Sequence, residues 1–193
     1  ADRLEQLAEG TRDWEFPLNP QDVNAGYIAA LNSVTFPAGI LQPPYFDPAA
    51  DPAVNFGAVA AVIGHEFGHG FDDQGSRSDG DGRVRDWWSA ASRVEFEKRT
   101  AGLVDQFSQY EPVPGAKING RQNLGENIGD LGGLSIAYAA YRKYVDDQQG
   151  GKAPVIDGFT GDQRFFMSWA QVWRSLVTES EERRRLLSDP HSP

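Results

Sequence analysis

His65-Glu66-Phe67-Gly68-His69 directly follows an apolar run, Val59 to Gly64, and this stretch decides what the chain can be. The run predicts a helix that continues through the motif, so two histidines four residues apart lie on one face. Two imidazoles on one helix face can bind one zinc ion, and the glutamate between them can reach a water molecule there. The stretch therefore predicts a catalytic zinc site on a buried helix.

The ordinary alternative is a pair of surface histidines on an unremarkable helix. Two of the chain's 3 histidines fall in this one motif, and a buried histidine pair without a partner would be costly. Zinc binding is therefore the favoured interpretation. Asp72 and Gly75 stand where the metzincin class of zinc peptidases has glycine and histidine, which excludes that class.

A second helical cluster, Glu126 to Asp130, offers the third ligand. Two histidines and Glu126 would leave the fourth tetrahedral position for water, as in catalytic zinc sites. The alternatives for Glu126 are a solvated helix residue or a capping carboxylate paired with Asn123. Asp130 lies one helical turn after Glu126 and is expected to hold the free ring nitrogen of His65. Asp72 could do the same for His69, or it could form a turn.

Glu66 is the expected general base, because a carboxylate beside a zinc-bound water can take its proton during attack on a peptide carbonyl.

The chain has no cysteine, so it has no thiol nucleophile, and a metal must be held by His, Asp or Glu. The formal charge of −10 argues against nucleic acid or an anionic membrane as partner. The longest apolar run, Ala58 to Gly64, is too short to span a bilayer.

The remaining pattern predicts one mostly helical α+β domain with a small sheet. Two short strands are expected at 23–28 and 33–36, with irregular chain at 37–48. Helices are expected at 52–73, 87–110, 123–147, 162–177 and 179–187, besides a helix tail at Leu4, Leu7 and Ala8. The 87–110 helix is expected to turn inward Trp88, Ala91, Phe96, Leu103 and Phe107. The segment 79–82 is a turn rather than a calcium loop, since the twelfth position is Ala90, and 183–185 is a solvated basic face.

Seven segments in order, covering about residues 14–193, resemble the neprilysin-like (M13) family of zinc metallopeptidases. They are VNAGY (23–27), FPAGILQPPYF (36–46), VIGHEFGHGFDDQG (62–75), DWW (86–88), NLGENIGDLGGL (123–134), AQVWRS (170–175) and DPHSP (189–193). The resemblance implies a zincin-like, thermolysin-like catalytic core that cleaves short peptides on the amino side of hydrophobic residues.

The resemblance also implies a role for individual residues. It places one Zn²⁺ on His65, His69 and Glu126, with Glu66 as base, Asp130 as the carboxylate that orients a ligand, and His191 as the group that stabilises the tetrahedral intermediate. The substrate-binding residues that it implies are Asn24 and Ala25 at an edge strand, and Ile40, Tyr45, Val62, Val172 and Trp173 in a hydrophobic pocket. By composition alone these last five would be ordinary core residues.

Two parts of the family pattern, a substrate-binding arginine after DPHSP and an N-terminal helical lid, have no counterpart in residues 1–193. The expectation is therefore a single-domain catalytic core whose partner is the remainder of its own polypeptide. One alternative function is a non-catalytic zinc-holding fragment that needs another chain to complete its site. A weaker alternative is a helical interaction module with fortuitous motifs.

Overall fold

A computed structural model describes residues 18–193, so the helix tail expected at Leu4, Leu7 and Ala8 lies outside the described residues. Strands β1 (Gly26–Ile28) and β2 (Ser33–Thr35) pair antiparallel, with Tyr27 opposite Val34. Both strands are shorter than predicted. The helices are α2 (Pro52–Asn55), α3 (Ala61–Gly68), α4 (Ala90–Phe107), α5 (Leu124–Gln148), α6 (Gly161–Val172) and α7 (Glu179–Ser188). The mostly helical α+β prediction is confirmed.

The predicted helix at 52–73 is present as one rod with three geometries. A π-helical stretch, Phe56–Ala60, joins α2 to α3, and a 3₁₀ turn, His69–Phe71, ends the rod. Asp72 then turns to an extended conformation. The prediction of burial on nearly every side was too broad, because Phe67 is 56% exposed whereas His65 and Glu66 are 6% exposed. The buried face of α3 is therefore the face that carries the motif.

Two glycines let α3 and α5 pack backbone against backbone. A Cβ atom on Gly133 of α5 would lie 2.4 Å from the His65 nitrogen and 2.5 Å from the Ala61 oxygen, both on α3. A Cβ atom on Gly64 would lie 2.8 Å from the Gly133 Cα. Since real side chains do not approach so closely, glycine is required at this crossing. The contact brings the first turn of α5 beside His65 of α3 and His69 just after it.

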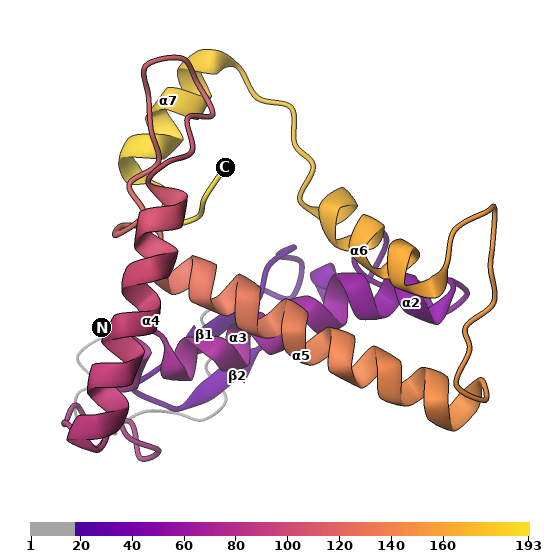
Figure 1. Cartoon of the computed structure of the whole chain (residues 1–193), viewed down its shortest axis with the longest axis horizontal. Helices are drawn as coiled ribbons and strands as arrows, with labels where there is room; N and C mark the ends of the chain where they lie inside the picture. The colour runs from indigo at the N-terminus through magenta and orange to yellow at the C-terminus, as the bar shows by residue number, and fades with distance from the viewer. Residues whose placement is uncertain (1–17) are drawn as a thin grey trace.

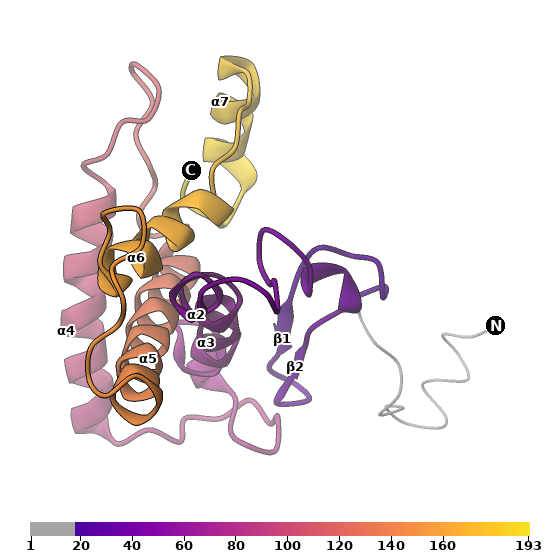
Figure 2. The same cartoon turned by 90° about the vertical axis from the view of Figure 1, so that its right-hand side faces the viewer.

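The helices and the hairpin form successive layers, which Figure 2 shows from α4 through α5 and α3 to β1 and β2. Figure 1 shows α3 and α5 running side by side, with α6 lying next to α2. The core between these helices consists of Ala53, Ala61, Ala137, Tyr141, Val145 and Phe165. Figure 1 also shows the C-terminus near α7, on the side of the molecule where α5 begins.

Four of the five residues predicted to face inward from the 87–110 helix are partly buried, and none is fully buried. Trp88, Phe96, Leu103 and Phe107 are half-buried, but Ala91 is exposed. Within the part of the chain that the structure describes, α4 contributes no fully buried residue. Arg93 covers the apolar side of this region instead, since its guanidinium lies 4.8 Å from the centre of the Trp88 ring.

The last two helices follow their capping residues. The Thr160 hydroxyl caps α6 by accepting a hydrogen bond from the Gln163 N–H, and the Gln163 side chain accepts one from the Thr160 N–H. Helix α6 ends at Val172, five positions before the predicted Val177, and the chain then runs to the Thr178 cap of α7.

The turn predicted at 79–82 is confirmed, since the Asp79 carboxylate accepts from the N–H groups of Asp81 and Arg83. Among residues 18–193, no helix has the length and apolar character to cross a bilayer.

Replacing Gly133 with alanine should lower the free energy of unfolding by about 1–3 kcal/mol, because the new methyl group meets backbone atoms that have nowhere to move. Gly132 is the matched control, since a Cβ there meets nothing within 4 Å. Gly132→Ala should be neutral or stabilise by about 0.5–1 kcal/mol. Denaturant unfolding measures both, and equal effects would contradict the backbone contact.

Candidate metal centre

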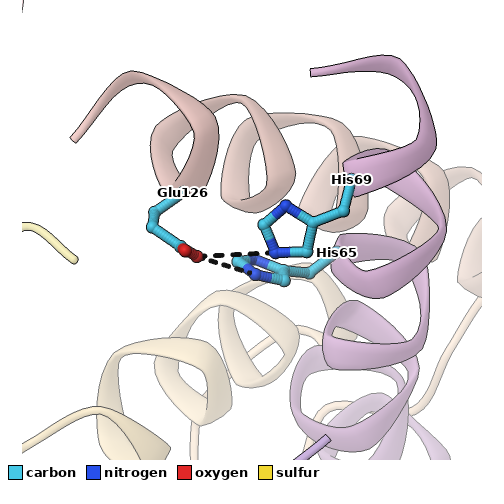
Figure 3. Close-up of side chains that lie close together, drawn as sticks. All are labelled: His65, His69 and Glu126. Carbon is cyan, nitrogen blue, oxygen red and sulfur yellow. Dashed lines mark ion pairs between the residues drawn. The ribbon is translucent and has the colours of Figure 1, made fainter. Parts of the chain in front are cut away.

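The two histidines of the motif and Glu126 converge on one small volume (Figure 3). Glu126 Oε2 lies 3.2 Å from His65 Nε2 and 3.5 Å from His69 Nε2. The candidate ligand atoms of these three residues lie within 4.8 Å of one another. The carboxylate comes from the first turn of α5, His65 comes from α3 and His69 begins the 3₁₀ turn that follows α3. The glycine contact between α3 and α5 therefore sets the separation of these side chains.

The Nδ1 atom of each histidine is hydrogen-bonded to a carboxylate. His65 Nδ1 lies 2.8 Å from Asp130 Oδ1, and His69 Nδ1 lies 2.8 Å from Asp72 Oδ2. The hydrogen-bond network therefore assigns the Nδ1–H tautomer to both neutral rings and turns the Nε2 lone pairs toward Glu126. Asp72 fulfils both roles considered from the sequence, since its Oδ1 also accepts from the Gln74 and Gly75 N–H groups.

This donor set fits a cation. Glu126 Oε2 is buried and accepts no hydrogen bond of good geometry from the described residues. Two Nε2 lone pairs and a carboxylate oxygen thus face one another, which is unfavourable unless a positive charge lies between them. Two imidazoles and one carboxylate are a common set for catalytic zinc. The residues present therefore fit zinc.

When no metal is bound, protons supply the positive charge. Burial lowers the pKa of His65, but hydrogen bonding to Asp130 and the contact with Glu126 outweigh it and raise the pKa to about 10. The pKa of His69 is also raised, because Asp72 and Glu126 outweigh the effect of burial. Burial acts to raise the pKa of Glu126, yet contacts with His191 and His65 hold it well below its ordinary value.

Glu66 and His191 flank this group. Burial raises the pKa of Glu66 above its ordinary value, although His65 and His69 oppose the shift. His191 comes from the chain after α7, and its Nε2 lies 3.2 Å from Glu126 Oε2. The contact with Glu126 raises the pKa of His191 to about 9. A carboxylate that can accept a proton and an imidazole that can donate one therefore lie at the same centre.

The centre lies in a cleft of about 970 Å³. Every residue proposed for substrate binding lines it: Asn24, Ala25, Ile40, Tyr45, Val62, Val172 and Trp173. The ring centres of Tyr45 and Trp173 lie 6.2 Å apart with an edge-to-face arrangement. Asn24 and Ala25 immediately precede β1, so the hairpin forms one wall of the cleft.

Several lining residues were not anticipated from the sequence. Tyr27, Trp169 and Arg174 line the cleft, and so does Arg185, which the sequence placed on a solvated basic face. The prediction of a solvated face is correct for Arg184, which pairs with Glu181. Arg185 pairs with Glu181 as well and also lines the cleft. Spacing alone offered no signal for Arg174, because it follows the end of α6.

Comparison with known proteins gives consistent results. The profile of Peptidase family M13 matches residues 24–193. Neprilysin-11 of Caenorhabditis elegans is 45% identical over 93% of this chain and 21% of its own length. Human endothelin-converting enzyme 1 is 42% identical over 98% of this chain and 24% of its own length. The chain thus spans about a quarter or less of these relatives.

Solved structures agree with the sequence relatives. The crystal structure of the zinc metalloprotease Zmp1 of Mycobacterium tuberculosis, in complex with an inhibitor, is 51% identical with a TM-score of 0.94. It covers 100% of this chain and 30% of the Zmp1 chain. The crystal structure of PepO from Lactobacillus rhamnosis is 31% identical with a TM-score of 0.86, over 97% of this chain and 28% of its own.

The stability of the metal-free protein should fall as pH rises from about 7 to 9.5. The pKa of His65 is raised from its ordinary 6.5 to about 10 by folding, so its stabilising effect is complete below 6.5 and is lost as pH approaches 10. Thermal unfolding in the presence of a chelator measures this fall. Added zinc should raise the Tm most at the high end of this range, because protons compete with it least there.

Glu126→Gln is the informative variant for the pH experiment, because it removes the carboxylate that faces both Nε2 atoms. Its Tm should fall less steeply with pH in chelator. The exposed Glu97, changed to Gln, serves as the control and should keep the wild-type slope. A wild-type Tm that stays level or rises over this pH range would contradict the claim that the metal-free histidines are protonated.

Proposed function

Because the chain belongs to peptidase family M13, we propose that it is the zinc-binding catalytic region of a peptidase that hydrolyses short peptides on the amino side of hydrophobic residues. The observation that carries the proposal is the buried Glu126 oxygen facing the Nε2 atoms of His65 and His69. Each ring is turned toward that oxygen by a carboxylate on its far side. Such support is typical of metal-binding histidines.

His65, His69 and Glu126 would hold one zinc ion and leave a position open for water or substrate. When bound, zinc supplies a Lewis acid that polarises the peptide carbonyl and makes water a stronger acid. Asp130 and Asp72 keep both rings in the tautomer whose Nε2 lone pair faces the centre. Their negative charge also makes the imidazoles better donors to a metal.

Glu66 would act as general base and accept a proton from the attacking water. Glu66 lies between His65 and His69 in the motif, and burial raises its pKa. A raised pKa suits a base that must later return the proton to the leaving amine. His191 would donate from Nε2 to the carbonyl oxygen as negative charge develops there, while its Nδ1 is held 2.9 Å from Asp189.

The lining of the cleft supports the proposed substrate class. Asn24 and Ala25 lead into β1, whose partner among residues 18–193 is β2 on one side, so an extended peptide can add along the other edge. Ile40 and Val62 are buried at the cleft, and Tyr45 and Trp173 add an aromatic wall. An apolar side chain after the scissile bond would bury its surface against these groups, which favours hydrophobic residues at that position.

A second candidate function is a zinc-holding region that hydrolyses peptides only when another segment completes the cleft. The observation that favours it is the short length of the match, since the chain spans 30% of the Zmp1 chain. On this account residues 1–193 are one domain of a larger peptidase, and the remainder of that polypeptide is its partner. Bound zinc without cleavage of a short hydrophobic peptide would favour this second function.

Glu66→Gln should lower kcat by about 10²- to 10⁴-fold, because it removes the proton acceptor and keeps the shape of the side chain. Zinc content should stay at one ion per chain, since Glu66 is not among the three ligands. The assay is cleavage of a short peptide with a central hydrophobic residue, with zinc measured by metal analysis. Glu97→Gln is the control and should cleave as the wild type does. Equal cleavage by Glu66→Gln and the wild type would refute the mechanism.

A further inference from the structure

His191 receives little support from its own segment. Residues 189–193 follow α7 without regular secondary structure, and the His191 side chain is 59% exposed. Within that segment the ring contacts Asp189 alone, and the His191 N–H donates to the same carboxylate. A residue that must meet a developing charge at about 3 Å needs firmer placement than this.

The support comes from α5 and the two residues before it. Asn123 Nδ2 donates to two consecutive carbonyl oxygens, 3.1 Å to Asp189 and 2.7 Å to Pro190. Gln122 Nε2 donates to the Asp189 oxygen at 2.9 Å. Two residues beyond Pro190, the Ser192 hydroxyl donates to Asn127 Oδ1 at 2.9 Å. These bonds enclose His191 on both sides in sequence.

Asn123 stands at the N-cap of α5, where an asparagine ordinarily accepts a hydrogen bond from the first turn of the helix. Among the described residues, its side chain makes no such bond. It is 4% exposed, so its amide group is desolvated and its donors must be satisfied within the protein. Both bonds go to the segment that carries His191. The capping arrangement of Glu126 with Asn123 that the sequence left open is therefore not formed.

We propose that Asn123 and Gln122 form a carboxamide clamp that positions His191 over the metal centre. The proposal rests on the proposed function of His191. Glu126 lies three residues after Asn123 on the same helical turn, so one rigid element places both a metal ligand and the segment of the oxyanion donor. The His191 Nε2 to Glu126 Oε2 distance of 3.2 Å is the result. Asn123 and Gln122 are positioning residues that act through His191.

Asn123→Ala is the direct test, and it removes no helix-capping bond. Amide hydrogen exchange at His191 and Ser192 should become faster, because the Asp189 and Pro190 carbonyls just before them lose the Asn123 donor. In the zinc-loaded protein, kcat should fall about 10- to 100-fold, with KM and zinc content unchanged. Gln148→Ala, an exposed carboxamide at the far end of α5, is the matched control and should change neither exchange nor kcat.

A double-mutant cycle separates positioning from a general structural role. In a His191→Ala background, Asn123→Ala should lower kcat by less than about twofold, because the residue through which it acts is gone. An equal loss in both backgrounds would overturn the clamp, and so would unchanged exchange or an unchanged kcat in Asn123→Ala. If the Asn123 variant folds poorly, Gln122→Ala, which is less buried and removes one bond, should show the same pattern with a smaller effect.

The two proposals fail in different ways. Absence of cleavage by the zinc-loaded wild-type protein overturns the proposed function. Unchanged exchange at His191 and Ser192 in Asn123→Ala overturns the clamp, whether or not the protein cleaves peptides.

Discussion

The backbone contact between α3 and α5 is the constraint on which the site depends. Gly64 and Gly133 remove the side chains that would hold the two helices apart, and Gly133 lies within contact of the His65 backbone. A larger separation would leave Glu126 out of reach of the histidine pair. The same helix pair also carries Asp130, which holds the far side of His65. One helix crossing thus sets the positions of Glu126, Asp130 and the histidine pair relative to one another.

Electrostatics then decide what the site can hold. The carboxylates of Asp72, Asp130, Glu66 and Glu126 surround two imidazoles in a largely buried volume, so the group attracts positive charge. In the absence of metal, this charge is provided by protons on the histidines, whose pKa values are raised. A divalent cation can replace those protons, and metal binding is therefore coupled to proton release. The same coupling makes a metal-free centre sensitive to alkaline pH.

The sequence predicted the parts of the fold that depend on local pattern. The sequence predicts the motif helix and the 123–147 helix to within one or two residues, because the loop residues that flank each of them, rich in Pro, Gly and Asp, are local signals. The end of α6 was placed too late because the apolar residues Leu176 and Val177 continue the pattern after Val172. In the structure, Trp173 instead packs against Tyr45 of the distant proline-rich segment. The contacts of Asn123 could not be foreseen, since its partners lie 66 and 67 residues away.

The most direct test of the central claim is an anomalous difference map at the zinc absorption edge, from a crystal of the zinc-loaded protein. The account predicts one peak per chain, bonded to Nε2 of His65, Nε2 of His69 and a carboxylate oxygen of Glu126. It also predicts an Asp130 carboxylate on the far side of the His65 ring. A map with no peak between these three side chains, or with zinc bound elsewhere on the chain, would contradict it.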